Sequence, residues 1–447
     1  MTSMLFLMVV PGMHLLASFL VIVGVTCLGS SFVILNSFLP LLVANHPLAQ
    51  EYNSLPGQDP AHIPMESMPP AHMDSALEDH DDDDQPSDYP KSKAASKAGS
   101  LELQLSTKIS SKGVGIGYLA AVFVQCLSIL LLYSTKRLSS DSSSQTLPLR
   151  LVLLLVGLWW FMFMIPSALW LRSRPGPPLR VSVPQRGILS FAYLGYVSFA
   201  WASLWKTIKA AAKLRQVAVF LVAWFLLSDA IGTVSGTAIL FARTELHMDT
   251  VPIAILSITA TTSGIAGAFT WPIISRRLAL KNNQTIIACM ILMEVIPVYG
   301  LMGYLPFVKA WGVGGLQQAW EIYPLGFIHG FVMGGLSSYC RSFFGLLIPP
   351  DREAAFYALY AITDKGSSAV GPAIVGAIVD ATGTIRPAFA FLAVLIALPV
   401  PLMWMVDAEQ GREDALKMAG LSKLEGRVPE SLDDIFQESE GLLGHDN

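Results

Sequence analysis

The chain has 447 residues, of which 53% are hydrophobic and only 14% are charged, and its formal net charge is -4. Soluble domains carry about 25% charged residues, so this composition excludes an ordinary soluble globular protein. All four cysteines lie within apolar runs, which argues against a disulfide framework or a zinc site. The sequence therefore predicts an all-α polytopic membrane protein.

Nine segments are predicted as membrane spans, because crossing about 30 Å of hydrocarbon takes about 20 apolar residues. They are 14–43, 114–134, 149–171, 217–242, 251–274, 284–306, 323–347, 356–380 and 386–406. A further stretch, 188–205, is rich in Tyr, Trp and Ser and runs into several lysines, so it suits a helix lying in the membrane interface as well as one crossing the bilayer. Residues 4–10 are too few to span and resemble the end of a helix whose start is absent, so we expect upstream coding sequence.

The basic residues orient the predicted bundle. Residues 172–215 contain eight Lys and Arg and no acid, and the positive-inside rule places this connection in the cytosol. Counting spans from there puts segment 45–112 and the tail 407–447 in the cytosol as well. Segment 45–112 is polar and rich in proline and acids, which predicts a disordered loop.

The predicted domain plan has four parts. Residues 1–171 form an incomplete N-terminal transmembrane half, 172–215 a basic cytosolic linker, 216–406 a C-terminal half of six helices, and 407–447 an acidic cytosolic tail. Two six-helix halves joined by a basic linker are the architecture of major facilitator transporters. The sequence thus predicts a bundle of the major facilitator type, truncated at its N-terminus to nine spans and a fragment.

Three ionisable residues stand well inside predicted spans with no nearby counter-charge: Asp229, Glu294 and His329. A carboxylate near the bilayer centre costs at least about 2.5 kcal/mol, so such residues usually face a bundle interior or a water-filled pathway. Carboxyl groups and histidine can also carry protons while a site alternates between two faces. We expect at least one of the three to act in transport, with a purely structural hydrogen-bonding role as the alternative.

Four more residues complete the predicted transport pathway: Asn36, Arg341, Asp364 and Lys365. Asn36 is the one amide deep in the first span, and Arg341 alternatively extends toward the cytosolic face. Asp364 and Lys365 are adjacent and point about 100° apart on a helix, so each is expected to find a partner on another helix. That partner is either a structural counter-ion or the substrate.

Small residues and proline predict close packing and a helix break. Gly330 and Gly334 form a GxxxG pair, which lets two backbones approach closely. Gly371 with Pro372 is expected to break its helix and free carbonyl groups for polar ligands. The sequence has no Walker, HExxH or GxSxG motif, so we expect neither an enzyme nor a cofactor, a metal site or a nucleic-acid partner.

Five long stretches carry a family resemblance: SSFVILNSFLPLLVANHP (30–47), LSTKISSKGVGIGYLAAV (105–122), LRSRPGPPL (171–179), AWFLLSDAIGTVSGTAILFARTEL (223–246) and SSYCRSFFGLLIPPDREAAFYALYAITDKGSSAVGP (337–372). In this order they resemble the autophagy-related vacuolar amino-acid effluxer family of fungi, a branch of the major facilitator superfamily. Residues 275–277 look like a degenerate form of the superfamily's helix-joining motif, and Asp351 stands where glycine is expected.

The resemblance implies a multi-pass transporter of the vacuole membrane. Such a transporter exports amino acids released by autophagic degradation from the lumen to the cytosol and supports survival in nitrogen starvation. Its implied partners are amino-acid substrates and the lipid bilayer, and the ionisable residues of the spans add protons as an expected coupling ion. Two other interpretations stay open: a non-transporting membrane scaffold or sensor derived from a truncated transporter, and a transporter of other small solutes at the plasma membrane.

The tail carries a predicted sorting signal, in which Glu438 precedes the pair Leu442 and Leu443. The spacing resembles acidic dileucine signals, whose leucines enter an apolar pocket of a sorting adaptor while the carboxylate meets a basic rim. A tagged chain with Leu442→Ala and Leu443→Ala should therefore fail to reach the vacuole membrane, as seen by fluorescence microscopy. Unchanged arrival would place the address elsewhere, and segment 45–112 would be tested next.

Overall fold

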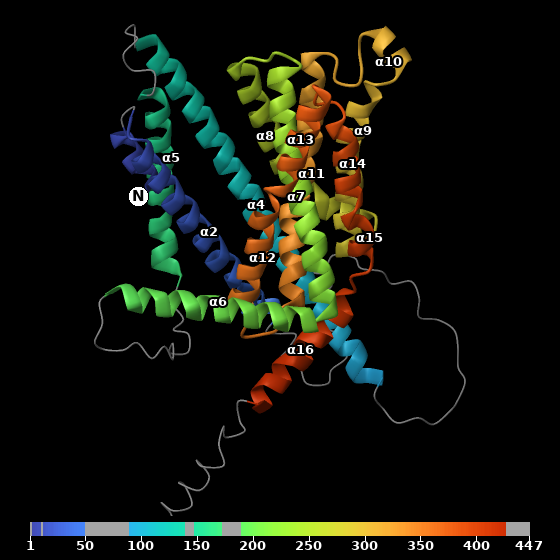
Figure 1. Ribbon diagram of the computed structural model, residues 1–447. Helices are drawn as coiled ribbons and strands as arrows, with labels where there is room; N and C mark the ends of the chain where they lie inside the picture. The colour runs from blue at the N-terminus through green and yellow to red at the C-terminus, as the bar shows by residue number, and fades with distance from the viewer. Residues whose placement is uncertain (1, 10–11, 50–88, 139–146, 172–188, 426–447) are drawn as a thin grey trace, which may run out of the picture.

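The computed structural model describes residues 2–9, 12–49, 89–138, 147–171 and 189–425, and within these ranges it contains helices and no strand. Figure 1 shows most of the long helices side by side in one bundle. In chain order, the longer helices and the parts of broken ones are α2 (His14–Ala44), α4 (Tyr89–Leu138), α5 (Leu147–Trp170), α6 (Leu189–Lys213), α7 (Arg215–Thr244), α8 (Thr250–Arg277), α9 (Asn282–Met302), α11 (Ile322–Leu347), α12 (Glu353–Ser367), α13 (Val370–Thr382), α14 (Ala388–Ala397), α15 (Pro399–Trp404) and α16 (Ala408–Glu425). The predicted all-α polytopic class is confirmed.

Most of the predicted spans are single helices, since a helix bonds every backbone group within itself and so can cross lipid. Of the described helices, α2, α4, α5, α7, α8 and α9 are long and apolar enough to cross a membrane, and residues Ala388–Trp404 add a seventh when they are counted together with Ala408–Gly420, across a bend of 66°. The two remaining predicted spans are less apolar or interrupted. Helix α11 carries polar residues such as His329 and Arg341, and segment 356–380 is split into α12 and α13.

Helix α6 marks one end of the bundle, which we call the α6 end. It contains residues 189–205 of the ambiguous stretch 188–205 and runs across the other helices, at the end where α7 starts, α11 finishes and α16 lies (Figure 1). Its length and composition do not place it among the candidate spans of the described residues. A crosswise course is what the interfacial alternative predicts for this stretch, and that alternative stays a prediction.

The N-terminal fragment and the polar segment after α2 both have structure. Residues 2–8 form α1 (Thr2–Leu5) and the 3-10 helix η1 (Phe6–Met8), where the Met4 side chain lies against Gly157 of α5. Residues 89–112 were predicted as part of a disordered loop, and that prediction is wrong for them because they form the first turns of α4. Several of these turns' polar side chains are buried against the bundle: Ser106, Thr107, Ser110 and Ser111. Residues 50–88 lie outside the described ranges.

Helices α8 and α11 pack at close range through glycine. A Cβ atom on Gly330 would meet the carbonyl oxygen of Ala260, and one on Gly334 would meet that of Gly264 and lie 2.6 Å from the amide nitrogen of Ala268. The predicted GxxxG pair on α11 therefore does face another helix, α8, and Gly264 of α8 takes part in the contact. Because the two backbones touch, side chains larger than hydrogen have no room in this seam.

The predicted break near Pro372 is present. Helix α12 ends at Ser367 and α13 begins at Val370, so one predicted span is two helices. Proline has no N–H to donate and its ring clashes with the carbonyl group four residues earlier, which here belongs to Ser368 at the break. The break therefore lies one helical turn before the proline that causes it.

The turn between α11 and α12 contains Asp351 at a φ of 70°, in the left-handed region. Glycine adopts this conformation without steric cost, which explains why glycine is expected there. Aspartate is one of the few other residues that tolerate it. The amide of Asp351 donates a 3.2 Å hydrogen bond to Oε1 of Glu353, which helps to hold the turn.

The glycine seam predicts a large loss of stability on substitution. Gly334→Val should lower the free energy of unfolding by at least about 1–3 kcal/mol, because overpacking forces the two backbones apart. Gly376→Val is the matched control, since a Cβ on Gly376 meets nothing within 4 Å. The melting temperature of each purified variant in detergent measures the difference, and equal melting temperatures would contradict the seam.

Candidate functional site

Two consecutive residues of α7 hold the break between α12 and α13. The Asp229 side chain is buried, and its Oδ1 accepts a 3.0 Å hydrogen bond from the amide of Gly371, the second residue of α13. The first N–H groups of a helix have no partner within that helix, and the helix dipole favours a negative charge beside them. Asp229 therefore caps α13 from a neighbouring helix.

The close approach of α7 to α13 depends on Gly371 itself. A Cβ atom at this position would collide with the hydroxyl group of Thr233 and would lie 3.0 Å from Oδ1 of Asp229. The Thr233 hydroxyl is in turn fixed by a 2.7 Å hydrogen bond to the carbonyl oxygen of Asp229. Glycine at the start of α13 thus lets the carboxylate reach the backbone directly.

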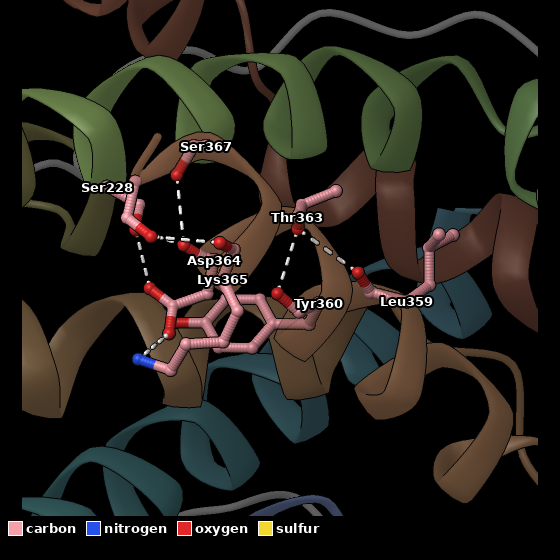
Figure 2. A network of polar contacts seen from close by, with 8 residues as sticks. Ser228, Leu359, Tyr360, Thr363, Asp364, Lys365 and Ser367 are labelled. Carbon is pink, nitrogen blue, oxygen red and sulfur yellow. Dashed lines mark hydrogen bonds and ion pairs between the residues drawn. The ribbon is translucent and has the colours of Figure 1, made fainter. Parts of the chain in front are cut away.

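On the other side of the break, Ser228 contacts the last full turn of α12. Its Oγ lies 2.5 Å from Oδ1 of Asp364 and 3.0 Å from the carbonyl oxygen of the same residue. Figure 2 shows the carboxylate of Asp364 between Ser228 and the amino group of Lys365. Ser228 therefore holds the end of α12 and Asp229 holds the start of α13, so the two residues fix both sides of the break in this helix.

The expectation for Lys365 is wrong. Its Nζ lies 2.9 Å from Oδ2 of the adjacent Asp364, so it finds its partner on its own helix, and its side chain is 77% exposed. The flexible four-carbon stem of lysine can bend back at the end of α12, where no further turn occupies the space. Asp364 does find a partner on another helix, as expected, in the form of Ser228.

The Arg341 side chain on α11 contacts both α2 and α4. Its Nη1 donates to Oδ1 of Asn36 on α2 at 3.1 Å, while Nε and Nη2 donate to Oγ of Ser110 on α4 at 3.2 and 2.8 Å. Its own carbonyl group accepts a 3.1 Å hydrogen bond from the Tyr357 hydroxyl of α12. Two predicted pathway residues, Asn36 and Arg341, are thus in direct contact.

His329 belongs to α11 and contacts α7 away from Asp229. Its Nε2 is 3.1 Å from Oγ of Ser235, and its Nδ1 is buried without a hydrogen-bond partner in the described part of the chain. Ser235 follows Ser228 by seven residues, which corresponds to about 10 Å along a helix. His329 on α11 therefore contacts the helix that carries Asp229 but is not part of the Asp229 site.

Glu294 lies away from both clusters. It lines an apolar groove of about 500 Å³ between α9 and the α14–α15 pair, and no residue of the Asp229 or Arg341 contacts lines that groove. One of its carboxylate oxygens is buried without a partner in the described residues. The three mid-span ionisable residues are consequently not brought together.

The sequence did not single out Ser228, Ser110 or the contacts of α16. Serines in membrane helices mostly donate to the backbone of their own helix, as Ser235 does to the carbonyl group of Ile231. Their positions in the sequence therefore do not show which of them contacts another helix. The sorting residues Glu438, Leu442 and Leu443 lie outside the described residues. In the ranges that the structure describes, no group of three or more His, Cys, Asp or Glu could hold a metal ion.

Known proteins similar to this chain agree on one family. A family model described as "Vacuole effluxer Atg22 like" matches residues 1–416. Autophagy-related protein 22-1 of Sclerotinia sclerotiorum is 59% identical over 442 residues, which are 98% of this chain and 72% of the relative. Autophagy-related protein 22 of Botryotinia fuckeliana is 59% identical over 98% of this chain and 72% of its own length. Autophagy-related protein 22-2 of Neosartorya fischeri is 58% identical over 100% of this chain and 73% of its own.

The cap on α13 predicts a difference between two substitutions. Asp229→Ala leaves the buried N–H of Gly371 without its acceptor and should cost about 1–3 kcal/mol of folding free energy. Asp229→Asn keeps a side-chain oxygen at the same place and should lose clearly less. Thermal unfolding of the purified proteins compares them, and equal melting temperatures for the two variants would show that the hydrogen bond contributes nothing.

Proposed function

Since the chain belongs to the family of Atg22-like vacuole effluxers, we propose that it exports amino acids from the vacuole lumen to the cytosol after autophagic degradation. It is a multi-pass protein of the vacuole membrane with a role in autophagy-linked efflux, and the description of the family as effluxers implies a transporter rather than an enzyme. Amino acids as the cargo and the direction of export are the parts that belong to this proposal.

The observation that carries the proposal is the discontinuous helix α12–α13, with a carboxylate at the start of its second part. Broken helices form the substrate and coupling-ion sites of many transporters, because their free backbone groups face a polar pathway in place of lipid. Asp229 binds the free N–H of Gly371 at 3.0 Å. Protonation of this carboxylate removes the charge that holds the start of α13, and so couples a proton to a movement of the break.

Alternating access supplies the mechanism. We assign residues 1–171 and 216–406 to two halves that rock against each other, with 172–215 as the linker, and we orient the α6 end toward the cytosol. The contacts of α2 and α4 with α11, centred on Arg341, then lie between the halves. A solute that enters from the lumen would reach the cytosol when these contacts open.

The export proposal predicts that vacuolar vesicles carrying the chain release radiolabelled leucine faster than vesicles without it. Asp229→Asn should slow this release about tenfold or more, which corresponds to about 1.4 kcal/mol, and should flatten its dependence on lumenal pH. Asp380→Asn serves as the control, because Asp380 is exposed near the end of α13.

Two results would contradict this prediction. Equal release from vesicles with and without the chain would favour the scaffold or sensor interpretation. Wild-type release by Asp229→Asn at every lumenal pH, at normal protein level, would remove the role of this carboxylate.

A further inference from the structure

The guanidinium group of Arg341 is surrounded by neutral acceptors. The donors Nε and Nη2 contact the hydroxyl of Ser110, Nη2 also lies 3.4 Å from the carbonyl oxygen of Ser110, and Nη1 contacts Asn36. A guanidinium has five N–H donors, and these contacts use four of them. One N–H of Nη1 therefore has no acceptor in the described part of the chain.

Among the residues that the structure describes, no carboxylate forms an ion pair with Arg341. The ion pairs among the described residues are Lys365 with Asp364, Arg412 with Glu102, and Lys417 with Glu413. A cation inside a membrane protein is normally paired, because an isolated charge loses its hydration without compensation. The group is held in position by hydrogen bonds, but its positive charge and one donor remain available for an anion.

A cavity of about 220 Å³ begins one helical turn from Arg341. Pro40, Ser106 and Gly345 line it, and each follows or precedes Asn36, Ser110 or Arg341 by four residues on the same helix. Each of the three lining residues lies closer to the α6 end than its partner, because α2 and α11 run toward that end and α4 starts from it (Figure 1). The cavity therefore lies directly between Arg341 and the proposed cytosolic face.

The far side of this cavity is closed by α16. Arg412 of α16 forms an ion pair with Glu102 of α4, with Nη2 and Oε2 3.1 Å apart, and both residues line the cavity. Ala415 and Leu416 of α16 complete the wall. The arrangement consists of a cation at the inner end, a small chamber whose lining includes Glu353, and an ion pair at the outer end.

We propose that Arg341, together with Asn36 and Ser110, forms a subsite that binds the carboxylate group of the transported solute before it enters the chamber closed by α16. This inference rests on the proposed export function and names the chemical group that the pathway recognises. A carboxylate accepts N–H donors in the plane of a guanidinium and neutralises it, which a hydroxyl or an amide oxygen does not do. Solutes without a carboxylate are accordingly rejected.

The decisive variant is Asn36→Asp, which is nearly isosteric and places a carboxylate of the chain itself against Arg341. If the contact is only a structural link between helices, this change adds an ion pair and leaves ligand binding unaltered. If the contact is the subsite, the new carboxylate competes with the solute. The variant separates the two roles without relying on a change that disrupts folding.

The measurement is the ligand-induced rise in melting temperature of the purified full-length chain. Leucine and 4-methylpentanoate, which share a carboxylate, should raise it, and leucinamide, which lacks one, should not. Asn36→Asp should melt no lower than the wild type and require at least tenfold more leucine for the same rise. Arg386→Gln is the control, because Arg386 donates to the carbonyl groups of Gly315 and Leu316 elsewhere, and it should keep the preference for leucine over leucinamide.

Three results would overturn the subsite: an equal effect of leucinamide and leucine, no effect of leucine on the wild type, or unchanged leucine dependence in Asn36→Asp. Vesicle release tests the export function separately. A carboxylate-dependent shift without release retains the subsite and removes export, whereas release without a carboxylate preference retains export and removes the subsite.

Discussion

The hydrogen bond between the Gly371 amide and the Asp229 carboxylate is the contact on which the C-terminal bundle depends. A helix that breaks within a membrane exposes backbone groups that lipid cannot satisfy, so each break needs partners from the protein itself. Here α7 supplies them from adjacent positions, Asp229 for the start of α13 and Ser228 for the end of α12. Because these two residues are neighbours on one helix, movement of either half-helix is transmitted directly to α7.

The same requirement explains the contrast between the two polar clusters. Asp229 has a helix terminus as its partner, so its charge is balanced by backbone dipoles within the structure. Arg341 has only neutral side-chain oxygens and a carbonyl group around it, so its charge is oriented but not balanced. One cluster therefore stabilises a broken helix, and the other offers an unbalanced charge at the contact of α2, α4 and α11.

Long apolar runs and mid-span polar residues made much of this fold predictable. The span positions, the GxxxG contact and the break before Pro372 follow from local chemistry that a single sequence contains. The partners do not, because they are set by which helix faces which: Asn36 and Arg341 are 305 positions apart and Asp229 and Gly371 are 142 apart. For Glu294 the sequence predicted a place in the transport pathway, but the residue lines a separate groove. A mid-span acid looks the same in sequence whether it faces the central helices or such a groove.

The ion pair between Glu102 and Arg412 makes the closed side of the cavity sensitive to salt. Their side chains are 31% and 19% exposed, so water and salt reach this closure, unlike the glycine seam between α8 and α11. An ion pair accessible to solvent weakens as ionic strength rises, whereas backbone packing does not. The resting conformation is thus held at its α16 side by a bond whose strength is set by the surrounding electrolyte.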